Sequence, residues 1–347
     1  MGKSVSFLKT PRVKTYRLPL HLPGAELNVT VGKRKIGSPA LNRVSGRGGS
    51  ILMSTLTSSP ISGFTAESLW QAWPEARFVT TLAPCLRHEE LLQYMQTLAS
   101  RYPDGIDLEE IGRSFQGRSI QMLKLGAGDK KIMLWSQMHG DEPSATPALL
   151  DIADYLLANS AQPAVRSLLE TCTLLIIPML NPDGAEVYER RNAQGIDINR
   201  DALQLSSPEG RLLKSVRDSY EPMLGFNLHD QNRMTTVGNT GRLATISLLS
   251  VSGDAENTLT RGRLRTKRAC TAIVEALAPY IPGGVARYDE EWSPQAFGDN
   301  ITAWGTPVLL IETGGLATGH EVSELTRLNF VAIMVVLLGL AEDDLVA

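Results

Sequence analysis

The chain of 347 residues alternates short apolar runs, of the length of buried strands, with amphipathic stretches of helical length. Strands that alternate with helices predict a mostly parallel, mixed sheet with helices packed on both of its faces. We therefore expect a single α/β domain over about residues 65–347, since no internal repeat or interior linker interrupts the pattern. The expected strands are 131–135, 173–179, 223–228 and 307–312, and the expected helices are 146–158, 208–220, 262–278 and 323–340.

A helix and a strand pair are expected ahead of this alternation. Residues 87–103 carry apolar side chains at helical spacing and end at a proline, which predicts a helix. The stretch 106–126 predicts two strands on either side of "RSFQGR".

The charge of the chain is unevenly distributed. Residues 1–52 hold ten basic side chains and one acidic side chain, whereas the remaining residues hold 24 basic and 36 acidic ones. An acidic body argues against nucleic acid as a partner. The first 52 residues lack periodicity and predict a disordered, dispensable tail. A transit peptide and an extension upstream of a true start at Met53 are the alternatives.

The cysteines and the hydropathy of the chain indicate in which cellular compartment we expect the protein. The three cysteines lie far apart and are odd in number, which favours a reducing compartment over a disulfide framework. The longest apolar stretch, 331–341, is shorter than the roughly 18 residues of a membrane span and predicts a buried terminal helix. With no secretory signal in the tail, we expect a cytoplasmic protein; the sequence leaves its oligomeric state open.

Polar residues follow the apolar strands at four separate places. "HGDE" (139–142) comes after the strand at 131–135, "NPDG" (181–184) after 173–179, and His229 ends "LGFNLH", while Glu312 ends "PVLLIE". Ligands of open α/β sheets bind at the carboxyl edge of the strands. Helix capping explains one such placement, but four together indicate a functional site.

The residue types at this edge suit a catalytic zinc, which needs three protein ligands and an open position for water. The chain has five histidines, His21, His88, His139, His229 and His320. The first lies in the tail, and His88 and His320 stand in a predicted surface helix and loop. His139, Glu142 and His229 remain as metal ligands, and Glu312 is a further carboxylate suited to act as a general base.

With these motifs, the chain resembles the zinc metallocarboxypeptidase family. "HGDE", "NPDG", "RRNAQGIDINRD", "NLHD" and "LLIETGG" occur in that family's order and rough spacing, and "IGRSFQGRSIQMLKLG" is similar to the strand pair before its zinc motif. The resemblance covers about residues 87–345. It implies a Zn²⁺ cofactor bound by His139, Glu142 and His229, and a peptide or acylated amino acid as substrate.

The resemblance also implies roles for residues outside the metal ligands. Glu312 would activate water and pass its proton to the leaving amine. Arg190, rather than its neighbour Arg191, would stabilise the oxyanion, while Asn199 and Arg200 would hold the terminal carboxylate of the substrate. A salt bridge to the flanking acids, Asp197 or Asp201, is the structural alternative for Arg200.

Three positions depart from the family pattern. Asp141 stands where the digestive enzymes have arginine, and it could orient a ligand imidazole or receive a cationic substrate group. Asn227 stands where many relatives have an acid. The tyrosine that closes on substrate has no clear counterpart, although Tyr280 and Tyr288 lie in the right interval.

Three functions therefore remain open. The first is a zinc carboxypeptidase, and the second is an acylamino-acid deacylase of the aspartoacylase and succinylglutamate desuccinylase type. The third is a non-catalytic metal-binding module on the same fold. "NPDG" and the "GRSFQGR" stretch favour the peptidase over the deacylase, and the intact Glu312 disfavours the non-catalytic module.

Overall fold

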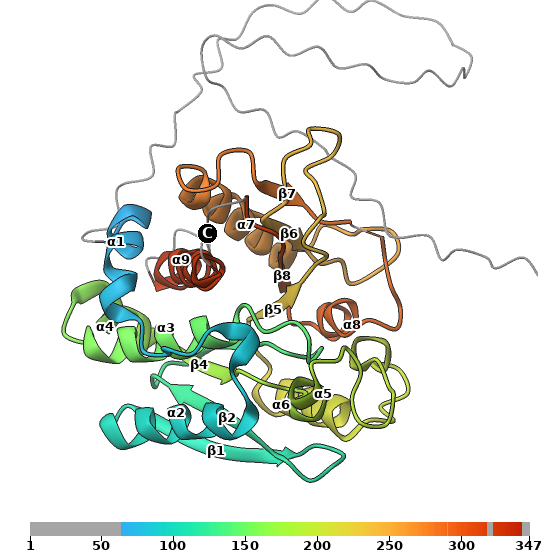
Figure 1. Cartoon of the computed structure of the whole chain (residues 1–347), viewed down its shortest axis with the longest axis horizontal. Helices are drawn as coiled ribbons and strands as arrows, with labels where there is room; N and C mark the ends of the chain where they lie inside the picture. Colours follow the sequence, from blue (N-terminus) through green and yellow to red (C-terminus); the bar gives the residue numbers. More distant parts are fainter. Residues whose placement is uncertain (1–63, 290, 318–321, 342–347) are drawn as a thin grey trace, which may run out of the picture. The chain divides into compact units, whose positions relative to one another are not determined.

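The computed structural model describes residues 64–289, 291–317 and 322–341. In this part of the chain eight strands form one sheet in the order β1-β2-β4-β3-β5-β8-β6-β7 (Figure 1). The central run β4-β3-β5-β8 is parallel, as is β6-β7, and the other pairs are antiparallel. The strands are β1 (Ile106–Arg113), β2 (Ser119–Leu125), β3 (Lys130–Trp135), β4 (Cys172–Ile177), β5 (Leu224–Asp230), β6 (Ile246–Ser250), β7 (Val285–Arg287) and β8 (Val308–Thr313).

The helices cover both faces of this sheet because the side chains of each central strand point alternately to two separate cores. In β3, Ile132 and Leu134 join one core, and Met133 and Trp135 join the other. The first core is closed by α1 (Ala66–Ala76), α2 (His88–Arg101), α3 (Thr146–Ala158), α4 (Pro163–Thr171), α7 (Arg261–Leu277) and α9 (Ser323–Ala341). The second is closed by α6 (Pro208–Tyr220), α8 (Phe297–Ala303) and the short η2 (Ile198–Arg200). Two further short helices are η1 (Ala83–Cys85) and α5 (Pro182–Val187).

The predicted mixed α/β fold is confirmed, and each predicted helix and strand occurs within a few residues of its expected bounds. The sequence analysis missed α1, α4, α5, α8, β6 and β7. Both missed strands are short, and three-residue β7 owes its extended conformation to pairing with β6 rather than to its own pattern. The predicted disordered tail, residues 1–52, lies outside the described residues.

Helix α9 corrects one expectation from the sequence. Its 19 residues are long and apolar enough, by length and composition, to cross a membrane, whereas the sequence had indicated a segment too short to do so. Most of the helix is nevertheless buried against the rest of the domain, where it contacts α1, α3, α4 and α7. Its apolar surface is thereby covered by protein, as expected for a core helix.

Candidate active site

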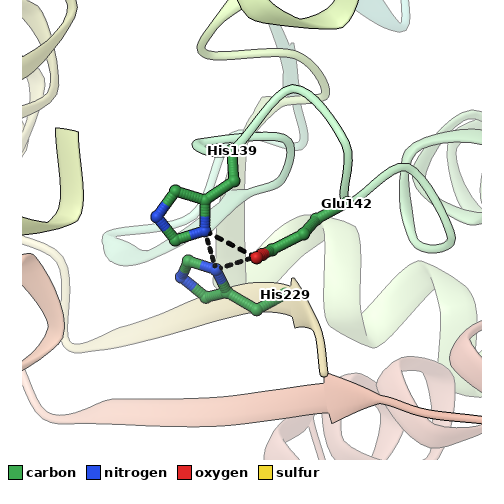
Figure 2. Close-up of side chains that lie close together, drawn as sticks. All are labelled: His139, Glu142 and His229. Carbon is green, nitrogen blue, oxygen red and sulfur yellow. Dashed lines mark hydrogen bonds and ion pairs between the residues drawn. The ribbon is translucent and has the colours of Figure 1, made fainter. Parts of the chain in front are cut away.

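Three side chains meet at the carboxyl edge of the sheet, as Figure 2 shows. Strands β3 and β5 are parallel neighbours, so the loop after β3 lies beside the end of β5. His139 Nδ1 lies 3.1 Å from His229 Nδ1, and Glu142 places one oxygen 2.8 Å from the first nitrogen and the other 2.6 Å from the second. We call His139, Glu142 and His229 the metal triad; all three are buried.

The geometry of the metal triad fits a zinc ion. Two imidazole nitrogens and a carboxylate that face one point repel one another through their lone pairs unless a proton or a cation lies between them. Ligand atoms of a tetrahedral zinc lie roughly 3.3–3.5 Å apart, since each is about 2.0–2.2 Å from the metal. The observed separations of 3.1, 2.8 and 2.6 Å are about 0.2–0.9 Å shorter, so the three side chains must move slightly apart to admit the ion. Burial lowers the pKa of His229, which favours the neutral imidazole that a metal requires.

Asp197 orients one of the two imidazoles. Its Oδ1 lies 3.1 Å from His139 Nε2, and this contact turns Nδ1 toward the other ligands. Arg190 donates from Nε to Asp197 Oδ2 at 3.0 Å, so the carboxylate is itself held in place. Asp197 makes the contact with His139 that the sequence analysis had suggested for Asp141, and among the described residues Asp141 forms no hydrogen bond with either imidazole. The sequence analysis treated Asp197 only as a possible partner for Arg200, because an acid two residues before "NRD" gives no signal of a contact with His139.

We expect Asp197→Ala to lower zinc affinity by roughly 10- to 100-fold, since outer partners of ligating histidines have effects of this size. Competition with a chromophoric chelator on the purified chain measures this. Asp197→Asn keeps an oxygen that can accept from His139 Nε2, and its loss should be clearly smaller. Equal zinc affinity in the wild type and in Asp197→Ala would contradict this role.

The glycine of "HGDE" is required by packing against "NPDG". A Cβ on Gly140 would lie 2.0 Å from the backbone carbon of Gly184, so only glycine permits this approach. Asn181 caps helix α5 by accepting from Gly184 N at 2.9 Å. Asp183 accepts from Ser114 Oγ at 2.7 Å and so ties the β1–β2 turn to the site loop. "NPDG" therefore supports the site through caps and loop contacts, and its polar side chains are absent from the lining of the cleft.

A cleft of about 820 Å³ opens beside the metal triad. Glu312, near the end of β8, pairs in register with His229 of β5 and lines this cleft. Burial raises the pKa of Glu312 well above its usual range, and the charges of Glu142 and Asp230 add to the effect. A hydrogen bond from the hydroxyl of Tyr288 lowers the pKa of the same carboxyl.

The structure distinguishes between neighbouring candidates that the sequence left open. Arg190 Nη1 donates to Glu142 Oε1 at 3.0 Å and lies 3.0 Å from His139 Nδ1, whereas Arg191 donates to Gly195 O. Tyr288 lines the cleft, whereas Tyr280 stacks on Trp70 in the first core.

Asn199 and Arg200 also line the cleft. Asn199 Oδ1 accepts from Phe297 N at 2.9 Å, which joins η2 to the start of α8. Arg200 donates to Asn199 O at 2.8 Å, and among the described residues it forms no salt bridge with Asp197 or Asp201. Its guanidinium thus remains available to a ligand.

The other residues named from sequence lie outside the metal triad. Asp141 lines a smaller adjoining pocket of about 290 Å³. His88 Nε2 lies 2.7 Å from Ser119 O, at the start of β2, and takes no part in the site. His21 and His320 lie outside the described residues.

Comparison with known proteins identifies similar sequences and folds. The family model described as zinc carboxypeptidase matches residues 91–229. The chain is 30% identical to carboxypeptidase 2 of Trichophyton rubrum over 42% of its own length and 28% of the relative's. For carboxypeptidase Z of Mus musculus these values are 27%, 39% and 24%. The chain thus spans less than a third of the length of these curated relatives.

Solved structures share the fold. A metallo-carboxypeptidase from Burkholderia cenocepacia superposes with a TM-score of 0.58 at 18% identity, covering 74% of this chain and 69% of that one. A metallo-carboxypeptidase from Pseudomonas aeruginosa, in complex with (2-guanidinoethylmercapto)succinic acid, has a TM-score of 0.58 at 21% identity and covers 75% and 69%.

Proposed function

We propose that this chain, which belongs to the zinc carboxypeptidase family, hydrolyses a C-terminal peptide bond or a related amide in a zinc-dependent reaction. One observation carries the proposal. The metal triad, the buried carboxyl of Glu312 and the polar side chains of Asn199 and Arg200 all line a single cleft.

His139, Glu142 and His229 would hold the zinc. When bound, zinc acts as a Lewis acid that polarises the scissile carbonyl and makes water a better nucleophile. Every other contribution would come from the chain itself.

Glu312 would take the proton from the attacking water and deliver it to the nitrogen of the leaving amine. Its buried position and raised pKa suit this role, since a proton acceptor works best when its pKa approaches the working pH.

Arg190 and Arg200 would each bind one negatively charged group of the reacting substrate. Arg190 is held by Asp197 and Glu142 while 41% of its side chain stays exposed, so its guanidinium can donate to the developing oxyanion. Arg200, beside Asn199, would hold the terminal carboxylate through paired N–H donors.

The test is a comparison of one acylated dipeptide as the free acid and as the C-terminal amide. Charge-assisted hydrogen bonds contribute about 1.5–3 kcal/mol each. We therefore expect amidation to lower kcat/KM by roughly ten- to a hundredfold, each tenfold being about 1.4 kcal/mol. Arg200→Ala should cost a similar factor with the free acid and little more with the amide, because both changes remove the same contact.

Arg191→Ala is the matched control, since it removes a neighbouring positive charge that points away from the cleft. It should leave both substrates nearly unaffected. If Arg200→Ala slows the amide as much as the acid, Arg200 is structural. A wild type that prefers the amide would disprove the exopeptidase function, and preferential cleavage of N-acylamino acids would favour the deacylase.

A further inference from the structure

The backbone turns sharply two residues before the first metal ligand. Gln137, just after β3, has a φ of 45°, in the left-handed region that residues other than glycine rarely adopt. This conformation costs free energy in a residue with a Cβ, whereas glycine adopts it without strain. Backbone strain of this kind persists where surrounding contacts impose it, and it clusters at functional sites. The strain at this position therefore points to a role for the glutamine side chain.

The side-chain amide of Gln137 bridges two parts of the loop after β3. The residue is 2% exposed. Its Nε2 donates to Gly140 O at 3.1 Å, and its Oε1 accepts from Thr146 Oγ1 at 2.7 Å. Gly140 lies in the turn 139–142, which carries two of the three metal ligands and which we call the ligand turn (Figure 2). Thr146 is the first residue of α3, so the amide fastens the ligand turn to the start of a buried helix.

The shape of the ligand turn depends on the direction of its central carbonyl. Glu142 N donates to His139 O at 3.2 Å, at the long end of the range for such bonds. The carbonyl of Gly140 lies between the two ligands in the chain, so its direction affects how their side chains face one another. If this carbonyl rotated, it would lose its bond to Gln137 Nε2 in a buried place, which is costly. Gln137 therefore restricts the relative placement of His139 and Glu142.

The main chain of Gln137 is held from the opposite side by the segment that leads to α5. Gln137 O accepts from Asn181 N at 2.9 Å. The hydroxyl of Thr146, which is the partner of the amide, also lies 3.0 Å from Pro178 O, shortly before "NPDG". The backbone and the side chain of Gln137 are therefore both fixed, and these contacts offset the strain of its left-handed conformation.

We propose that Gln137 is a positioning residue for the metal triad. Its amide holds the ligand turn so that His139 and Glu142 face His229 before zinc arrives, and a site arranged in advance binds its ion more tightly. Gln137 does not line the cleft, so its effect on hydrolysis acts through the metal. This inference rests on the proposed function, since it concerns the same site, but zinc binding tests it without any substrate.

The test compares Gln137→Ala with Gln137→Gly. Both variants lack the amide, but only glycine relieves the left-handed backbone. Both should bind zinc roughly 10- to 100-fold more weakly than the wild type, the range for residues that support metal ligands. The metal-free glycine variant should nevertheless unfold at a higher temperature than the metal-free alanine variant. Chelator competition measures the affinity, and thermal unfolding of the metal-free full chain measures the stability.

Cobalt provides a second readout, which a loss of stability alone does not change. Co²⁺ can replace zinc in a site of this kind, and its visible absorption bands depend on the arrangement of the ligands around it. The bands of the Co²⁺-loaded chain should therefore differ from those of the wild type in both variants of Gln137.

Asn300→Ala is the matched control. Asn300 carries a buried amide on α8 that donates to Pro294 O and Ala296 O at 2.8 Å each, outside the loop after β3. Its replacement should lower the unfolding temperature, because two buried hydrogen bonds are lost. The zinc affinity and the cobalt bands should match those of the wild type.

Three results would overturn the inference. Wild-type zinc affinity in Gln137→Gly together with weak binding in Gln137→Ala would mean that the backbone angle matters and the amide does not. Wild-type affinity in both variants would refute the role directly, and an equal loss in Asn300→Ala would reduce it to general destabilisation. If Gln137→Ala does not fold, the zinc affinity of Gln137→Gly decides alone.

The proposed function and this inference can fail separately. A wild type that binds zinc but cleaves neither the free-acid nor the amidated dipeptide would disprove the carboxypeptidase. The zinc affinities of the two variants would still decide the role of Gln137. Unchanged zinc affinity in variants of an active enzyme would refute the positioning role and leave the carboxypeptidase intact.

Discussion

Glu312→Gln is expected to retain zinc while its turnover rate falls roughly 10²–10⁴-fold, the range that general acid–base groups contribute. Glutamine keeps the size of the side chain but cannot take a proton from water. Glu312 is buried near the end of β8, and this burial raises the pKa of its carboxyl. Burial thus disfavours the charged form, so a neutral side chain of the same shape should not disturb the fold. Steady-state rates on a free-acid dipeptide, together with zinc content and the thermal midpoint, measure all three properties.

Asp141→Asn serves as the control for this prediction. Asp141 is the other acid named at this edge from sequence, and it lines the adjoining pocket rather than the main cleft. Its replacement should leave turnover close to wild type. If Glu312→Gln keeps full turnover and Asp141→Asn does not, the proton acceptor has been assigned to the wrong carboxylate.

His229→Ala should lower zinc affinity by more than the roughly 10- to 100-fold expected for an outer partner, since two ligands hold zinc far less well than three. Zinc that binds only the folded chain stabilises it by about 4 kcal/mol at a thousandfold excess over Kd. The wild type should therefore show a zinc-dependent rise in its unfolding midpoint that the variant lacks. Chelator competition and denaturant titrations with and without zinc provide the two readouts.

His88→Ala is the matched control, because His88 contacts Ser119 O away from the metal triad. It can lower stability through the lost hydrogen bond, but the zinc-dependent shift should remain. A full zinc-dependent shift in His229→Ala would remove that residue from the site.

The sequence by itself determined the central sheet and the metal triad, for a physical reason that is local. Parallel strands buried on both faces need continuous apolar runs, so β3, β4, β5 and β8 are visible as such in the sequence. Polar residues at the ends of such runs must meet at one sheet edge. His139, Glu142, His229 and Glu312 could be selected on that basis, and the structure brings all four to one cleft.

Only the tertiary structure decided which neighbours of these residues take part. Arg190 and Arg191 are adjacent and chemically identical, and the path of the loop alone sends one to the metal triad and the other to Gly195 O. Asp197 reaches His139 across 58 residues of sequence. Helix α8 packs over Asn227, a contact between segments about seventy residues apart. Such contacts follow from how the helices pack on the finished sheet, and no local pattern of residues encodes them.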